Sequence, residues 1–192
     1  MTNKKVKIVF NSPVILSFVF ACFIATTLGV ITEGNMTEKI FSTYHTSLKN
    51  PMTYFRFFTY IFGHDGWNHF IGNISYILLL GPMLEEKYGS QNILSVIEIT
   101  AITAGLINYI FFWNVSLCGA SGIVFAFILL ASFTSFKEGE IPLTFIFVAI
   151  IFIGQQIYEG ISSNNNISYI THIIGGIVGT LIGYHFNRKN AV

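Results

Sequence analysis

Four polar side chains interrupt long apolar stretches of the sequence. They are His69 and Asn73, one helical turn apart, Ser121 in Gly119-Ala120-Ser121-Gly122, and His172. Strongly polar groups inside apolar segments are costly, which makes them candidates for function. A serine hydroxyl becomes an effective nucleophile when an adjacent base takes its proton. His172 could do this for Ser121 and later protonate a leaving amine.

The same residues could stabilise the oxyanion that forms when a serine attacks a carbonyl. Asn73 offers its side-chain amide, His69 its ring N–H and Ser121 its backbone N–H, and all three are hydrogen-bond donors. His69 and Asn73 share one face of a helix because they are four residues apart. Asp65 is the only aspartate and precedes the apolar stretch, so we expect a dyad without a third acidic member.

Six apolar runs must position these side chains, and each is long enough to cross a bilayer as a helix, about 17–22 residues. Lipid offers no partners for backbone polar groups, so helices are the expected spanning form. The sequence therefore predicts an all-α, polytopic membrane protein with a bundle of six transmembrane helices. The predicted spans are Pro13–Ile31, Asn68–Leu84, Asn92–Trp113, Ala120–Phe136, Ile141–Ile157 and Ile167–Phe186.

The basic residues predict the orientation of the bundle. With the N-terminus inside, seven Lys and Arg residues lie in inner segments and three in outer segments, which favours both termini in the cytoplasm. The longest connection, Thr32–Trp67, is then an outer loop rich in aromatic residues that we expect to lie partly buried at the membrane interface. The inner set is Lys4, Lys5, Lys7, Lys87, Lys137, Arg188 and Lys189, and the outer set is Lys39, Lys49 and Arg56.

The three candidate spans bring their polar groups to one level. Each group lies 16 residues before a charged residue expected at the cytoplasmic face: Glu85 for His69, Lys137 for Ser121 and Arg188 for His172. At 1.5 Å per residue this is about 24 Å above that face, close to the outer surface. Gly175, Gly179 and Gly183 form a stripe on the last span, which predicts close packing against the span of Ser121. This packing would bring the His172 ring within hydrogen-bonding reach of the Ser121 hydroxyl.

Composition supports a membrane domain and excludes several classes of protein. Hydrophobic residues make up 53% and charged residues 10% of the sequence, a lower charged fraction than soluble domains have. We predict a single domain over residues 1–192, with its core at about 13–187. A net charge of +1 gives no basic field for nucleic acid. There is no HExxH motif for a zinc protease and no second aspartate for an aspartic protease, so we expect neither a metal nor another cofactor.

Taken together, the motifs resemble the rhomboid family of intramembrane serine proteases. The matching pieces are His69-x-x-x-Asn73, Gly119-x-Ser121-Gly122 and His172-x-x-Gly175, in the order and spans that a six-helix rhomboid core has. The resemblance implies Ser121 as nucleophile, His172 as general base, and Asn73 and His69 at the oxyanion site. It also implies transmembrane segments of other proteins as substrates, in a protein embedded in the lipid bilayer of the cell membrane.

The chain departs from the family pattern at three positions. Phe55 precedes Arg56 where the family often has tryptophan, Phe125 replaces a tyrosine that stacks on the histidine, and Cys118 stands where glycine is common. None of these changes removes a residue of the proposed dyad. Arg56, together with Glu85 after the second span, resembles the structural positions of the family.

Two other functions remain open at this point. A relative without activity would keep the fold and bind transmembrane helices, and a small transporter would line a pathway with His and Asn side chains. The intact Ser121 and His172 argue against the first, and the absence of an internal repeat argues against the second. The role of His64 is open, and Glu98 is expected to be paired, to face a cavity or to lie near the interface. Neither the substrate nor the oligomeric state follows from the sequence.

Overall fold

The computed structural model describes residues 7–134, 140–162 and 167–189. Over these residues the chain forms eight α-helices, and its only strand-like pairing is an isolated bridge between Thr43 and Leu117. The predicted all-α fold is confirmed. The helices are α1 Pro13–Ile31, α2 Asn35–Lys39, α3 Pro51–Thr59, α4 Gly66–Tyr88, α5 Ser90–Phe111, α6 Ser121–Ser132, α7 Leu143–Ser162 and α8 Ile167–Lys189.

Each of the six predicted spans coincides with one helix; Pro13–Ile31 matches α1 at both ends, and the other five differ at one or both ends. α4 extends beyond the predicted Asn68–Leu84 at both ends, because its polar terminal residues are helical too. α6 ends at Ser132, whereas the end predicted for this span, Phe136, lies outside the described residues. Within the described part of the chain, only α1 and α5 are both long and apolar enough to be clear membrane spans. The count of six spans therefore stays a prediction.

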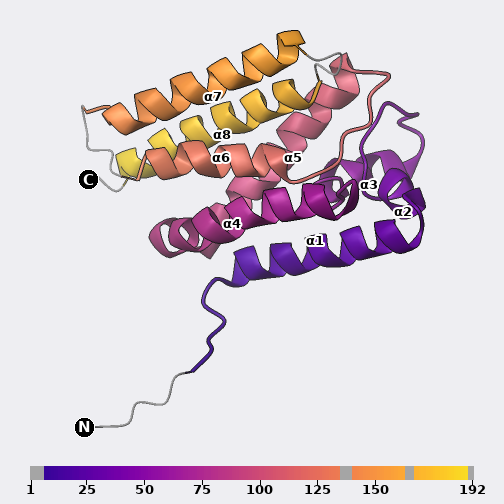
Figure 1. Cartoon of the computed structure of the whole chain (residues 1–192), viewed down its shortest axis with the longest axis horizontal. Helices are drawn as coiled ribbons and strands as arrows, with labels where there is room; N and C mark the ends of the chain where they lie inside the picture. The colour runs from indigo at the N-terminus through magenta and orange to yellow at the C-terminus, as the bar shows by residue number, and fades with distance from the viewer. Residues whose placement is uncertain (1–6, 135–139, 163–166, 190–192) are drawn as a thin grey trace.

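The short helix α6 lies at the centre of the bundle. It contacts α4, α5, α7 and α8, and its Phe127 and Leu130 side chains are fully buried. Figure 1 shows α1 beside α4 and α7 beside α8, while α5 crosses behind α4 and α6 at a steep angle. α1 begins and α8 ends at the same end of the bundle, and α2 and α3 lie at the opposite end.

The connection between α1 and α4, predicted as a loop, contains the two short helices α2 and α3. Asn50 caps α3 by accepting a hydrogen bond from the Met52 N–H, and Pro51 occupies its first turn. The buried Arg56 of α3 donates from Nε to the Lys39 carbonyl at 2.8 Å, and its guanidinium lies 4.4 Å from the centre of the Tyr44 ring. These contacts make the connection a packed layer over one end of the bundle, which we call the α2/α3 layer (residues 32–65).

At the other end of the bundle, a carboxylate joins α1 to α4. The buried Glu85 of α4 accepts hydrogen bonds from the backbone N–H groups of Val14 and Ile15, each at 3.0 Å, and from the Ser90 hydroxyl at 2.7 Å. The first N–H groups of a helix have no partner within the helix, and its N-terminus favours negative charge. Glu85 therefore fixes the start of α1 against α4.

Glycine residues bring the backbones of α6 and α8 into direct contact. A Cβ atom placed on Gly175 would lie 2.1 Å from the Gly122 carbonyl oxygen, and one on Gly179 would lie 2.2 Å from the Ala126 carbonyl oxygen. Gly183 faces the side chains of Leu130 in α6 and of Phe133, the residue that follows α6. The predicted packing of the glycine stripe against the helix of Ser121 is confirmed.

Candidate active site

Ser121 is the first residue of α6, and its side chain is half-buried. A backbone N–H at this position has no acceptor within the helix, so it can donate to a group that approaches the N-terminus of α6. Gly119 has a φ of +117°, a conformation that favours glycine, and its N–H donates to the Tyr60 carbonyl at 2.9 Å. The chain segment just before Ser121 is thus fixed to the α2/α3 layer by this hydrogen bond.

His69 and Asn73 of α4 lie directly beside this turn. A Cβ atom on Gly119 would be 2.7 Å from Cε1 and 2.8 Å from Nε2 of His69, and 3.6 Å from Nδ2 of Asn73. A larger residue at position 119 would therefore displace the His69 ring, whereas Asn73 lies at ordinary van der Waals distance. Asn73 is buried, and its Nδ2 has no hydrogen-bond partner among the described residues. A buried amide without a partner is a donor available to a reacting group.

The ring of His69 presents Nε2 to the turn before Ser121. The backbone N–H of Asp65 points to Nδ1 of His69 at 3.4 Å, so Nδ1 is the accepting nitrogen. In a neutral imidazole the proton is then on Nε2. This is the nitrogen near Gly119, and it is oriented to donate toward the start of α6.

His64, whose role the sequence left open, supports the ring of His69. The two rings are 5.1 Å apart in an edge-to-face arrangement, and His64 also packs against Phe70 at 5.5 Å. Its Nδ1 donates to the Phe62 carbonyl at 3.1 Å. Burial lowers the pKa of His64 to about 4, and neighbouring His69 contributes to that lowering, so His64 is neutral near pH 7. Helical periodicity could not reveal this role because His64 precedes α4.

His172 reaches the same region from α8. Its ring centroid is 4.3 Å from that of Phe125, which is one turn beyond Ser121 on α6. The carbonyl oxygen of the preceding residue, Thr171, would lie 3.6 Å from a Cβ on Gly122. His172 therefore lies against the first turn of α6. The predicted hydrogen bond between Ser121 and His172 stays a prediction.

Cys118 is the other nucleophilic side chain close to this turn. It is half-buried, and burial raises the pKa of its thiol, with only a partial offset from a hydrogen bond with Ser42. A thiol with a raised pKa is a poor nucleophile, because the thiolate is the reactive form. Cys118 is therefore a weaker candidate nucleophile than a serine with an adjacent base. Within the described parts of the chain, no three His, Cys, Asp or Glu side chains gather closely enough to hold a metal ion.

Residues 51–189 match the family model of the rhomboid domain. The chain belongs to the rhomboid family. It is therefore an integral membrane protein. It is 33% identical over 139 residues to Rhomboid-related protein 1 of Caenorhabditis elegans, covering 67% of this chain and 39% of that protein.

Two further relatives of this rhomboid chain span a wide range of organisms. It is 29% identical over 159 residues to Rhomboid-related protein 2 of Mus musculus, covering 71% of this chain and 52% of the relative. It is 22% identical over 147 residues to Rhomboid-like protein 11, chloroplastic, of Arabidopsis thaliana, covering 69% of this chain and 52% of that protein. The match thus spans about half the length of these relatives or less.

Proposed function

We propose that this rhomboid chain is an intramembrane serine endopeptidase that cleaves transmembrane segments of other membrane proteins. Ser121 is the nucleophile, His172 is the general base, and Asn73 and His69 bind the oxyanion. The observation that carries the proposal is the convergence at the start of α6. There, Gly119 lies against His69 and Asn73, and Phe125 lies against His172.

The chemistry follows from the positions of the donors. His172 takes the proton of the Ser121 hydroxyl as Oγ attacks the scissile carbonyl carbon, and the carbonyl electron pair becomes an oxyanion. Nδ2 of Asn73, Nε2 of His69 and the N–H of Ser121 donate to that oxyanion. His172 then protonates the leaving amine, and the acyl-enzyme is hydrolysed by a water that His172 deprotonates in turn.

The proposed setting is the cell membrane, with six transmembrane helices and both termini in the cytoplasm. Two observations support this arrangement. The helices α1 and α4 to α8 coincide with the six apolar runs, and α1 begins at the same end of the bundle at which α8 ends. The α2/α3 layer, with the candidate site just beneath it, would then face the outside.

Cleavage of a single-span substrate in detergent tests the proposal. We expect Ser121→Ala and His172→Ala to lower the rate at least about a thousandfold, and Asn73→Ala to lower it about a hundredfold. Ser132→Ala is the matched control, because Ser132 lies at the far end of α6 and its hydroxyl donates to the Ile128 carbonyl. Thermal unfolding of each variant shows whether it remains folded.

The outcomes separate the alternative functions. Activity that survives in folded Ser121→Ala would show that Ser121 is not the nucleophile. If the wild type binds single-span helices but cuts none of a panel with varied small residues at the cleavage site, the chain is a helix-binding rhomboid relative. Solute uptake into vesicles without cleavage would instead indicate a transporter.

A further inference from the structure

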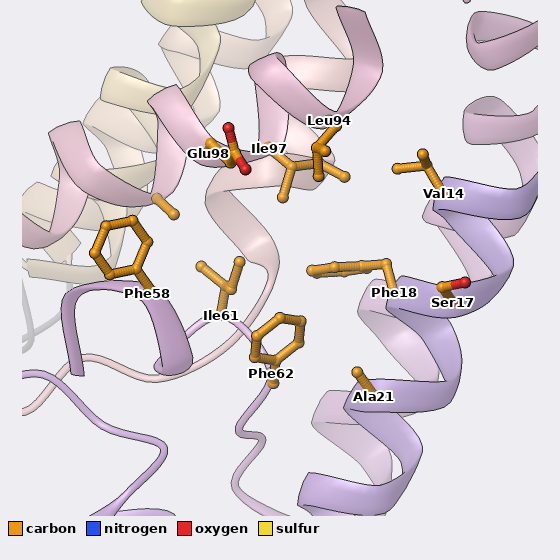
Figure 2. A pocket seen from close by; sticks show the side chains of 11 residues that line it. Val14, Ser17, Phe18, Ala21, Phe58, Ile61, Phe62, Leu94, Ile97 and Glu98 are labelled. Atoms are coloured by element: carbon orange, nitrogen blue, oxygen red, sulfur yellow. The ribbon is translucent and has the colours of Figure 1, made fainter. Parts of the chain in front are cut away.

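A lateral pocket of about 300 Å³ lies between α1, α5 and the segment that ends α3. None of its lining residues belongs to α6 or α8, so it is separate from the candidate active site. Figure 2 shows Phe18 of α1 and Ile97 of α5 on facing sides of the pocket, with Phe62 below both of them and level with Ala21 of α1. The lining is apolar except for Ser17 and Glu98.

Glu98 places a carboxylate deep within a membrane span. It lies eight residues after the first residue of α5, about 12 Å along a helix of about 33 Å. α5 is one of the two clear membrane spans of the described chain. The Glu98 side chain is exposed at the pocket, and no described residue hydrogen-bonds or ion-pairs with it. A carboxylate at this depth is costly unless a cation or a donor pairs with it.

We propose that the groove between α1 and α5 binds a transmembrane helix of a partner protein that carries a lysine or arginine near the middle of its span. Such a side chain is the cation that reaches this depth, whereas the charged groups of lipids remain at the membrane surface. The small side chains of Ser17 and Ala21 are four residues apart on α1, so the partner backbone can approach closely there.

The groove is held open by contacts made elsewhere in the fold. Glu85 and the close approach of Ile15 to Gly81 fix α1 to α4 rather than to α5. Phe58 and Ile61 from the α2/α3 layer also line the groove. A helix in the same bilayer would approach the groove from the side, between α1 and α5.

A second copy of this chain would not supply the cation. All ten Lys and Arg residues of the sequence lie outside its six apolar runs, so a second copy offers no cation within a predicted span. A partner with a different sequence is required. The proposed binding site depends only on the groove and on Glu98, so the proposal does not require the chain to be a protease.

Energy transfer between labelled molecules in lipid vesicles tests this proposal. The probe is a synthetic polyleucine helix with one lysine at its centre, and the full-length chain carries Ser121→Ala so that the helix is not cut. We expect the lysine helix to bind about tenfold more tightly than an all-leucine helix, the range that one interhelical polar contact allows. Glu98→Gln should remove this preference, and Ala21→Leu should weaken binding of both helices by filling the groove.

A charge swap makes the test specific. Glu98→Lys should prefer a helix with a central glutamate, which the wild type should not. Glu86→Gln is the matched control, because Glu86 is an exposed carboxylate at the end of α4 outside this groove, and it should leave the lysine preference intact. Equal binding of lysine and leucine helices to the wild type would overturn the proposal, as would a loss of preference in Glu86→Gln equal to that in Glu98→Gln.

Discussion

The α6–α8 and α1–α5 helix pairs belong to one bundle but meet in opposite ways. Between α6 and α8, Gly175 and Gly179 bring the backbones into contact, and no space remains for one added carbon at either position. Between α1 and α5, the side chains stay apart around a pocket of about 300 Å³ with Glu98 on its wall. The closed pair holds the candidate dyad, whereas the open pair holds an intramembrane charge.

The difference between these two helix pairs shows that one bundle can contain both a tightly packed helix interface and a loosely packed one. In a bilayer, helices associate mainly through packing and polar contacts, because lipid is as apolar as their side chains. A site that must hold Ser121 and His172 in a fixed geometry needs the closed kind of interface. An interface that receives another helix needs the open kind, and polar contacts to α4 keep α1 in place beside it.

The largest effect is expected from adding one carbon to the closed pair. Gly179→Ala places a Cβ 2.2 Å from the Ala126 carbonyl oxygen and 2.7 Å from its Cα, and backbone atoms cannot move aside as a side chain can. We expect a loss of about 3 kcal/mol in stability, the upper part of the usual range for overpacking, together with loss of activity. Thermal unfolding in detergent measures the first, and substrate cleavage measures the second.

Gly176→Ala is the control for that variant. It adds the same carbon to the same helix, but its nearest neighbour would be the Phe152 ring at 3.4 Å. Because alanine also favours the helix over glycine, the control should be neutral or slightly stabilising. If both variants unfold at the same temperature, close contact between α6 and α8 does not hold the site together.

A smaller effect is expected from removing the contact that keeps α1 on α4. Glu85→Ala leaves the N–H groups of Val14 and Ile15 and the Ser90 hydroxyl without their carboxylate acceptor. We expect stability to fall by about 2 kcal/mol. Glu85→Gln keeps one oxygen acceptor and should lose about half as much. An unfolding temperature unchanged in Glu85→Ala would show that α1 is held in place by its apolar contacts alone.

The smallest effect is expected from enlarging a side chain in the open pair. Ala21 lines the pocket, so Ala21→Leu has space to fill and should change stability by less than about 1 kcal/mol. Comparison of its unfolding temperature with that of Gly179→Ala measures the contrast between the two helix pairs directly. A destabilisation as large as that of Gly179→Ala would mean that the groove closes in the membrane.

The sequence predicts the long helices well and the α2/α3 layer poorly, for a physical reason. The length and apolarity of each span are local properties, so the Pro13–Ile31 run matches α1 at both ends. α2 has only five residues, and α3 is held by Arg56 through contacts with residues up to 17 positions away. Such helices depend on tertiary contacts that periodicity does not encode.

The candidate site was predictable because its residues are polar in apolar surroundings. That contrast revealed His69, Asn73, Ser121 and His172, and the glycine spacing indicated which helices touch. The contrast does not reveal His64, which lies outside the helices, or the donors to Glu85, two of which are backbone groups. The sequence left three settings open for Glu98, and the pocket selects the one that faces a cavity.

The bridge between Thr43 and Leu117 has a consequence for biosynthesis. Each residue donates its N–H to the carbonyl of the other at 2.9 Å, and Tyr60 accepts from Gly119 close by. The residues just before Ser121 thus acquire their conformation from segments that the ribosome completes long before it reaches them. A partly synthesised chain that ends after the α2/α3 layer already contains Thr43 and Tyr60, the partners of Leu117 and Gly119. The two residues of the candidate dyad can come together only once α8 has been synthesised.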